Sequence, residues 1–176
     1  MGRPRGTSAF TELVEHRGHA LLRTAYLLVG DHQLAEDLLQ EALVKTLIAL
    51  PRIRDISRIE GYVRQTMVRT VIGWRRRRSF HERPSDALPE APIDDGADVV
   101  ATHQLLVAHL RGLPPRQRTA IVLRYYEDLS VAQTAELMDC SVGAVKSHVS
   151  TGLARLRERM GPSLDLVPTG EEELTS

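Results

Sequence analysis

The sequence has almost no cysteine, few aromatic residues and no long apolar run. Cys140 is the single cysteine among 176 residues, which excludes disulfide frameworks and zinc sites built from several cysteines. No stretch of about 18 apolar residues occurs, which argues against a transmembrane span. Residues 1–10 carry Arg and Gly instead of the apolar segment of a secretory signal. We therefore expect a protein of the reducing cytoplasm with no membrane insertion.

Net charge is also lacking, because 23 Lys and Arg balance 23 Asp and Glu. This total hides a banded distribution, in which acidic stretches at 31–41, 84–101 and 162–176 alternate with basic stretches at 52–83 and 146–159. Nearly all cations are Arg, whose planar fork pairs well with phosphate. Two separate basic bands indicate two contacts with a polyanion, although each band alone also suits a solvated helix face.

The first half of the chain shows helical periodicity and no convincing strand pattern. Helices are predicted over residues 9–30, 33–50 and 59–78. Gly30 is expected to end the first helix, Asp31 to cap the second and Pro51 to end it, with a polar loop at 52–58. The apolar stripe of the second helix is predicted to comprise Leu34, Leu38, Leu39, Ala42, Leu43, Thr46 and Leu47.

A segment rich in Pro and acids follows, and its composition predicts a linker between two lobes that need not touch. Beyond it, helices are predicted over residues 102–111, 117–127, 131–138 and 142–160. The expected fold class is all-α, with two small helical domains joined by a flexible acidic linker. Its predicted boundaries are 8–79 for the first domain, 80–101 for the linker, 102–160 for the second domain and 161–176 for an acidic, disordered tail.

Residues 130–156 carry a helix-turn-helix pattern, in which a short capped helix is followed by a longer one. Ser130 and Gln133 have capping-box spacing, and Ala135 is small enough for a close helix crossing. The longer helix has an apolar stripe formed by Val145, Val149, Leu153 and Leu156. Its other face carries short polar groups and one cation near the helix N-terminus, which is the end that enters the DNA major groove. An ordinary helical hairpin with a polar face is the alternative.

These residues resemble the extracytoplasmic-function (ECF) sigma factors of the sigma-70 family over about residues 10–159. The stretch GDHQLAEDLLQEALVKTL is similar to sigma region 2.2, and IEGYVRQTMVRTVIGWRRRR is similar to regions 2.3 and 2.4. In the second lobe, LPPRQR, LRYYEDLS and SVGAVKSHVSTGLARLR are similar to region 4. The combination is more specific than any single stretch.

The resemblance implies a protein that is not an enzyme, needs no cofactor or metal, and directs core RNA polymerase to promoters. Region 2.2 docks on the β′ clamp helices, and its matching residues here are Asp37, Gln40 and Glu41. Contacts with the −10 element are implied for Arg52, Arg54, Arg58, Tyr62, Arg69, Trp74, Arg75, Arg76 and Arg77. Contacts with the −35 element are implied for Ser141, Gly143, Lys146, Ser147, Ser150, Thr151 and Arg155. Region 4 also binds the β flap, and family members often have an anti-sigma partner, of which the sequence carries no distinct mark.

Three positions depart from the family pattern and predict weaker or different base contacts. Asn is common where Arg69 stands, Arg where Thr151 stands, and Arg or Gln where His148 stands. Two aromatic residues have two interpretations each, since Tyr62 and Trp74 could either stack on a base or pack in the core.

A helix-turn-helix regulator of response-regulator type is the rival function, but it needs a strand-containing receiver domain. His16 and His19 form too weak a pattern for a metal site.

Overall fold

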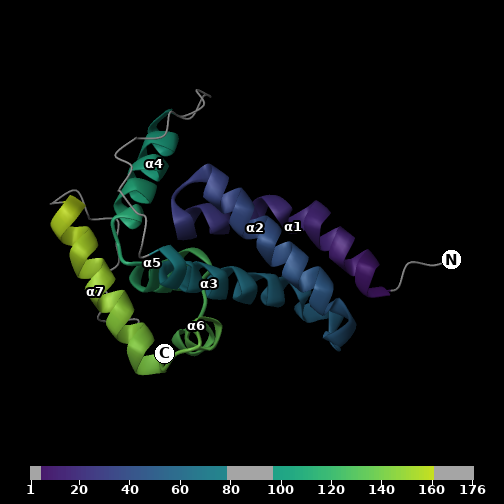
Figure 1. The fold of residues 1–176 in the computed structure, drawn as a ribbon. Coiled ribbons are helices and arrows are strands. Elements are labelled where there is room, and N and C mark those ends of the chain that lie inside the picture. The colour runs from purple at the N-terminus through teal and green to yellow at the C-terminus, as the bar shows by residue number, and fades with distance from the viewer. Residues whose placement is uncertain (1–4, 79–96, 161–176) are drawn as a thin grey trace.

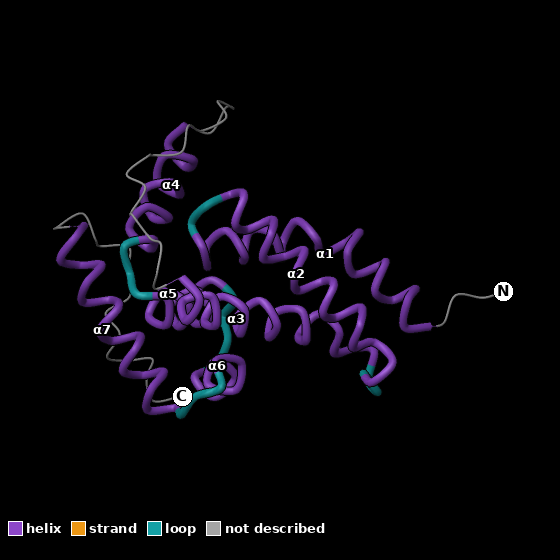
Figure 2. Tube along the Cα trace, in the orientation of Figure 1, coloured by secondary structure: helices purple, strands orange, loops and turns teal. Residues whose placement is uncertain are grey.

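The computed structural model describes residues 5–78 and 97–160, which contain helices and loops but no strand (Figure 2). The helices are α1 (Arg5–Val29), α2 (His32–Ala49), α3 (Ile59–Arg78), α4 (Ala97–Arg111), α5 (Pro115–Ile121), α6 (Val131–Met138) and α7 (Val142–Met160). Short 3-10 turns, η1 (Leu50–Arg52) and η2 (Ile56–Arg58), lie between α2 and α3, and a π-helical turn, η3 (Val122–Tyr126), follows α5. The predicted all-α fold class is confirmed. None of the described helices combines the length and the apolar character needed to cross a bilayer.

Capping side chains determine where several helices begin, as their sequences predict. The carboxylate of Asp31 accepts a hydrogen bond from the Leu34 N–H at 2.9 Å, next to the corner that Gly30 makes with a φ of 74°. Ser130 and Gln133 form the complete capping box of α6. At the start of α7, Ser141 Oγ accepts a hydrogen bond from the Ala144 N–H at 3.1 Å. Each cap satisfies an amide that no helical carbonyl can reach.

The first lobe consists of α1, α2 and α3, with α1 and α2 side by side and α3 packed against both (Figure 1). On α2 the buried residues are Ala35, Leu38, Ala42 and Thr46. The prediction that Leu47 belongs to this stripe is wrong, because its side chain is 47 % exposed. Leu47 follows Thr46 and so lies about 100° around the helix from it, beyond the surface that α1 and α3 cover.

The second lobe consists of α4 to α7 and contains the expected helix-turn-helix pair, α6 and α7. Val145, Val149, Leu153 and Leu156 are buried along α7, as predicted. Residues 117–127, predicted as one helix, divide into α5 and the wider turn η3, in which the Glu127 N–H donates to the Val122 carbonyl at 3.0 Å. Helix α4 begins at Ala97, within the range predicted as linker. The rest of the predicted linker and the predicted tail lie outside the described residues.

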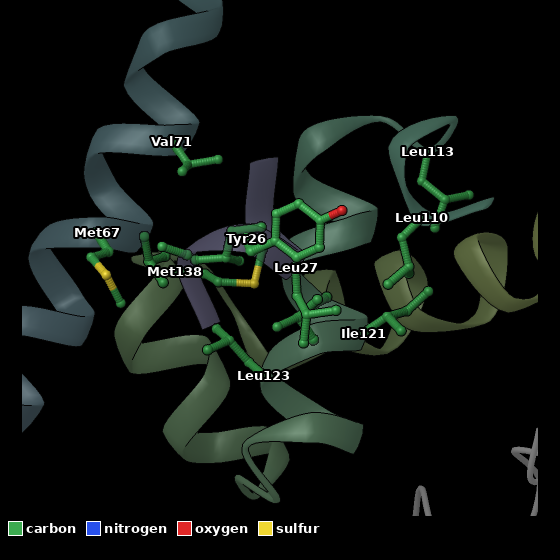
Figure 3. Packing of buried hydrophobic residues seen from close by; sticks show 14 of the residues in the cluster. Tyr26, Leu27, Met67, Val71, Leu110, Leu113, Ile121, Leu123 and Met138 are labelled. Carbon is green, nitrogen blue, oxygen red and sulfur yellow. The ribbon is translucent and has the colours of Figure 1, made fainter. Parts of the chain in front are cut away.

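The two lobes pack against each other and share one apolar core. Figure 3 shows the side chains involved: Tyr26 and Leu27 from α1, Met67 and Val71 from α3, and Leu110, Leu113, Ile121, Leu123 and Met138 from the second lobe. In Figure 1, α6 lies below α3, and α7 runs along the opposite side of the second lobe from α1. The sequence had indicated two lobes with no need to touch, whereas the structure joins them through buried side chains.

Candidate functional site

A groove of about 480 Å³ lies between α2 and α3 on the first lobe. Three cationic side chains line it: Lys45 on α2, Arg52 in η1 and Arg69 on α3. Two aromatic residues, Tyr62 and Trp74, line it as well. Cations beside exposed aromatic rings form the arrangement that binds single-stranded nucleic acid, because the cations neutralise phosphates and the rings stack on bases.

The predicted −10 residues are thus partly brought together by the fold. Arg52, Tyr62, Arg69 and Trp74 share the groove. Tyr62 is 37 % exposed, whereas Trp74 is half-buried and packs against the core as well as lining the groove. The side chains of residues 75–77 lie outside the described part of the structure.

The loop before α3 carries the other predicted −10 residues, Arg54 and Arg58, both of them exposed. Asp55 organises this loop, because its carboxylate accepts hydrogen bonds from the Ser57 N–H at 3.1 Å and from the Ser57 hydroxyl at 2.6 Å. These hydrogen bonds, together with the nearby Arg58, lower the pKa of Asp55. The loop therefore presents its arginines from a backbone that Asp55 holds in place.

One side of α2 faces away from both the core and the second lobe. We call it the outer stripe, and it comprises Asp37, Gln40, Val44, Leu47 and Ile48. Asp37 and Gln40 are exposed, as the predicted polymerase contact requires. Val44 and Ile48 are 56 % and 73 % exposed, so the stripe presents apolar surface next to its polar residues. Sequence reasoning missed this apolar surface, although Val44 and Ile48 lie about 120° or more around the helix from the buried Ala42.

Glu41, the third residue predicted to bind polymerase, lies at the edge of the groove instead of on the outer stripe. Its carboxylate forms an ion pair with Lys45 Nζ at 2.5 Å. Lys45 Nζ also donates a hydrogen bond to Thr70 Oγ1 on α3, at 3.3 Å. This chain of contacts links α2 to α3 and positions the Lys45 cation in the groove.

The exposed face of α7 carries the residues predicted to bind the −35 element. Six of these residues are exposed: Gly143, Lys146, Ser147, Ser150, Thr151 and Arg155. Ser141 is exposed too, but its hydroxyl is engaged as the cap of α7. Val142, which sequence reasoning missed, is 44 % exposed in the first turn and adds an apolar group that suits a thymine methyl. Arg155 Nη1 donates to Gln117 Oε1 at 3.2 Å, so its guanidinium leans toward α5.

The remaining titratable candidates do not form a reactive centre. Burial, followed by the nearby Arg116, lowers the pKa of His148, which favours its neutral form. Burial raises the pKa of the Cys140 thiol and so disfavours the reactive thiolate. His16 and His19 are exposed on α1, and in the described part of the chain no three His, Cys, Asp or Glu side chains meet where they could hold a metal ion.

Comparison with known families matches both lobes. A model of Sigma-70 region 2 matches residues 13–81, and a model of Sigma-70 region 4 matches residues 103–156. The RNA polymerase sigma-E factor of Streptomyces coelicolor is 42% identical over 151 residues, which cover 86% of this chain and 85% of that protein. The ECF RNA polymerase sigma factor ShbA of Streptomyces griseus is 33% identical over 145 residues and 74% of each chain.

A solved structure shares the fold of nearly the whole chain. The sigma factor RpoE of Bartonella quintana, in complex with the anti-sigma factor NepR, aligns with a TM-score of 0.64 and 24% identity. The alignment covers 89% of this chain and 98% of that one, so the likeness in fold extends over both lobes.

Proposed function

Because the chain belongs to the extracytoplasmic-function sigma factors of the sigma-70 family, we propose that it binds core RNA polymerase and directs initiation at promoters by reading their −35 and −10 elements. The observation that carries this proposal is the pairing, in one chain, of a region 2 lobe with a region 4 lobe. The chain itself makes no covalent bond in this scheme and supplies recognition and DNA opening only. The comparisons do not favour a response regulator.

We assign polymerase docking to the outer stripe of α2. Its exposed apolar residues, flanked by Asp37 and Gln40, form the mixture expected of a protein interface: an apolar centre that excludes water and a polar edge that sets orientation. The stripe is accessible although the two lobes pack together, because each of its five side chains is exposed in the described structure. Polymerase can therefore reach α2 without any change in how the lobes pack.

We assign the melted −10 strand to the groove between α2 and α3. Lys45, Arg52 and Arg69 would neutralise the strand, and Tyr62 would stack on an unpaired base. The loop ordered by Asp55 follows Arg52, which lines the groove, and this loop would hold a base that is flipped out of the duplex. The family often has the neutral Asn at this position, whereas Arg69 places a longer, positively charged side chain at the site.

We assign the duplex −35 element to the exposed face of α7. Small side chains between Gly143 and Thr151 let the helix enter a major groove closely, and its N-terminus favours phosphate. An anti-sigma partner is a further proposal, suggested by the family and by a fold likeness to a sigma factor that was solved with one.

The direct test of the function is run-off transcription with core polymerase, with and without the protein. Templates would be drawn at random from the host genome, so that no promoter has to be assumed. We expect the protein to add discrete transcripts that share a −35 and a −10 sequence. Unchanged transcript patterns, together with no binding of the chain to core polymerase, would contradict the proposal.

Lys146→Ala is expected to weaken −35 binding about equally for all sequences. Lys146 is the single cation on the first two turns of α7, and a phosphate contact contributes affinity without base selectivity. The slope of log affinity against log salt should fall by about one unit. Fluorescence anisotropy of polymerase bound to −35 duplexes over a salt series measures this slope. A change of preference at one base pair, with the slope unaltered, would instead make Lys146 a base contact.

A further inference from the structure

We propose that Glu127 is a latch that holds the second lobe closed on the first in the free chain, and that the latch must open before both promoter elements can be read. The opening step rests on the proposed function, whereas the closed state does not. Glu127 directly follows η3, and its side chain is only 8 % exposed. Such a buried carboxylate needs partners, and it finds them in the other lobe.

The partners of Glu127 come from α1 and α3. Its Oε2 lies 3.0 Å from Nη2 of Arg64 on α3, and its Oε1 accepts a hydrogen bond from the hydroxyl of Thr24 on α1. Thr24 is 2 % exposed, and the Arg64 side chain is 22 % exposed. Both carboxylate oxygens are therefore used across the interface between the lobes, in surroundings that screen the charges little.

The backbone before Glu127 is shaped to make this contact. In η3 the Glu127 N–H reaches back five residues to the Val122 carbonyl, which widens the turn relative to an α-helix. Such wide turns change the direction of the side chains that follow, and they occur often at functional positions. Here the wide turn packs against α1, where Glu127 contacts Thr24.

Two arginines of the second lobe contact the C-terminal end of α1. Arg118 Nη1 lies 3.4 Å from the Val29 carbonyl oxygen, at the helix end that attracts cations. The stem of Arg111 lies over Gly30, where an added Cβ would come within 2.0 Å of Arg111 Cγ. These contacts, together with the shared apolar core that Figure 3 shows, give the closed state a specific geometry.

The closed state cannot present both reading surfaces to one promoter. Elements near −35 and −10 are about 25 base pairs apart, which is roughly 85 Å along the DNA axis. In the closed state α6 packs on both α3 and α7, so the axes of α3 and α7 lie on the order of 20 Å apart. The 18 residues between α3 and α4 can span at most about 60 Å, which allows the second lobe to move well away from α3 while its helices stay folded.

The latch is suited to opening because Arg64 is shared. Its Nη2 also lies 2.8 Å from Glu60 Oε1 in its own lobe, so Arg64 keeps an ionic partner when Glu127 leaves. Arg64 Nε is buried and has no hydrogen-bond partner among the described residues, which raises the free energy of the closed state. Core polymerase would shift the population toward the open state by binding the second lobe through the β flap at a distance from the first lobe, because that contact differs between the two states.

The test measures the distance between the lobes in the full chain, free of polymerase and DNA. Spin labels are attached at His19→Cys on α1 and Ala132→Cys on α6, which are both exposed positions, after Cys140→Ser has removed the native cysteine. Pulsed electron paramagnetic resonance then measures the distance between the two labels. We expect one short distance for the parent. Glu127→Lys or Arg64→Glu should shift most of the population to a broad distribution of longer distances. The combined exchange Arg64→Glu with Glu127→Lys should return the short distance.

Matched controls separate the latch from general effects of charge and folding. Glu136→Lys on α6 and Arg23→Glu on α1 make the same charge changes at exposed positions that form no ion pair in the described structure, and they should leave the short distance unchanged. Helix content by circular dichroism should be the same throughout, and the milder Glu127→Gln serves if Glu127→Lys unfolds.

Identical distances for the parent and for folded latch variants would overturn the proposal, and so would a parent that is already broad. Adding core polymerase to the parent should lengthen the distance between the two labels. An unchanged short distance in that complex would contradict the proposal that the lobes separate. Run-off transcription is measured separately. If the chain initiates at promoters but has no closed state, the latch proposal is contradicted and the proposed function is not.

Discussion

Val44→Glu is expected to reduce binding to core polymerase by more than about 30-fold, because it places a charge at the centre of an apolar contact. A hot-spot residue at such a position contributes about 2 kcal/mol or more to the free energy of binding. Val44 is 56 % exposed in the middle of the outer stripe and does not line the groove between α2 and α3. The free energy of unfolding should change by less than about 0.5 kcal/mol, as for most exposed positions. Surface plasmon resonance with immobilised core enzyme measures the affinity, and thermal unfolding measures the stability.

Two comparisons sharpen the Val44 experiment. Ala132→Glu adds the same charge to an exposed position on the second lobe and should leave the affinity for core enzyme unchanged. The pair Asp37→Ala with Gln40→Ala removes polar contacts at the edge of the stripe and should weaken binding by only several-fold. A Val44→Glu protein that binds core enzyme as tightly as the parent would place the docking surface elsewhere.

The sequence predicted well those features that are fixed locally. The bounds of α3, α6 and α7 agree with the prediction, because caps such as Ser130 with Gln133 act over three residues and leave a readable pattern. The buried stripe of α7 was also predicted, since it repeats every three or four residues. In the first lobe, the groove brings together Arg52, Tyr62, Arg69 and Trp74, which the family resemblance had already grouped.

Features that depend on packing between distant segments could not be predicted in the same way. In the sequence Glu127 is one acid in the run YYEDL, and its burial depends on the wide turn η3 and on Arg64, which lies 63 residues earlier. Leu47 matched the apolar periodicity of α2, but nothing in α2 itself says how far around the helix its neighbours reach. A pattern thus identifies an apolar residue, whereas its exposure depends on the tertiary structure.

Tyr62→Ala is expected to slow promoter opening by about 5- to 150-fold, the equivalent of the roughly 1–3 kcal/mol that one stacked base contributes. Tyr62 is 37 % exposed in the groove, so its removal should leave the thermal midpoint nearly unchanged. Trp74→Ala should slow opening as well, but should also lower the midpoint, because Trp74 packs against the core. Tyr62→Phe should retain opening, since the ring provides the stacking surface.

Opening is followed by the fluorescence of 2-aminopurine placed in the −10 element, with core polymerase and saturating amounts of each variant. Tyr126→Ala removes a tyrosine of similar exposure, 46 %, from the second lobe, and it should open the promoter as the parent does. A template with a preformed mismatch bubble at −10 separates two roles of Tyr62. If Tyr62 acts only in strand separation, the bubble restores the full rate; if it also holds the separated strand, complexes on the bubble dissociate faster than those of the parent. Parent-like opening and lifetime for Tyr62→Ala on both templates would show that the groove does not receive the melted strand at this residue.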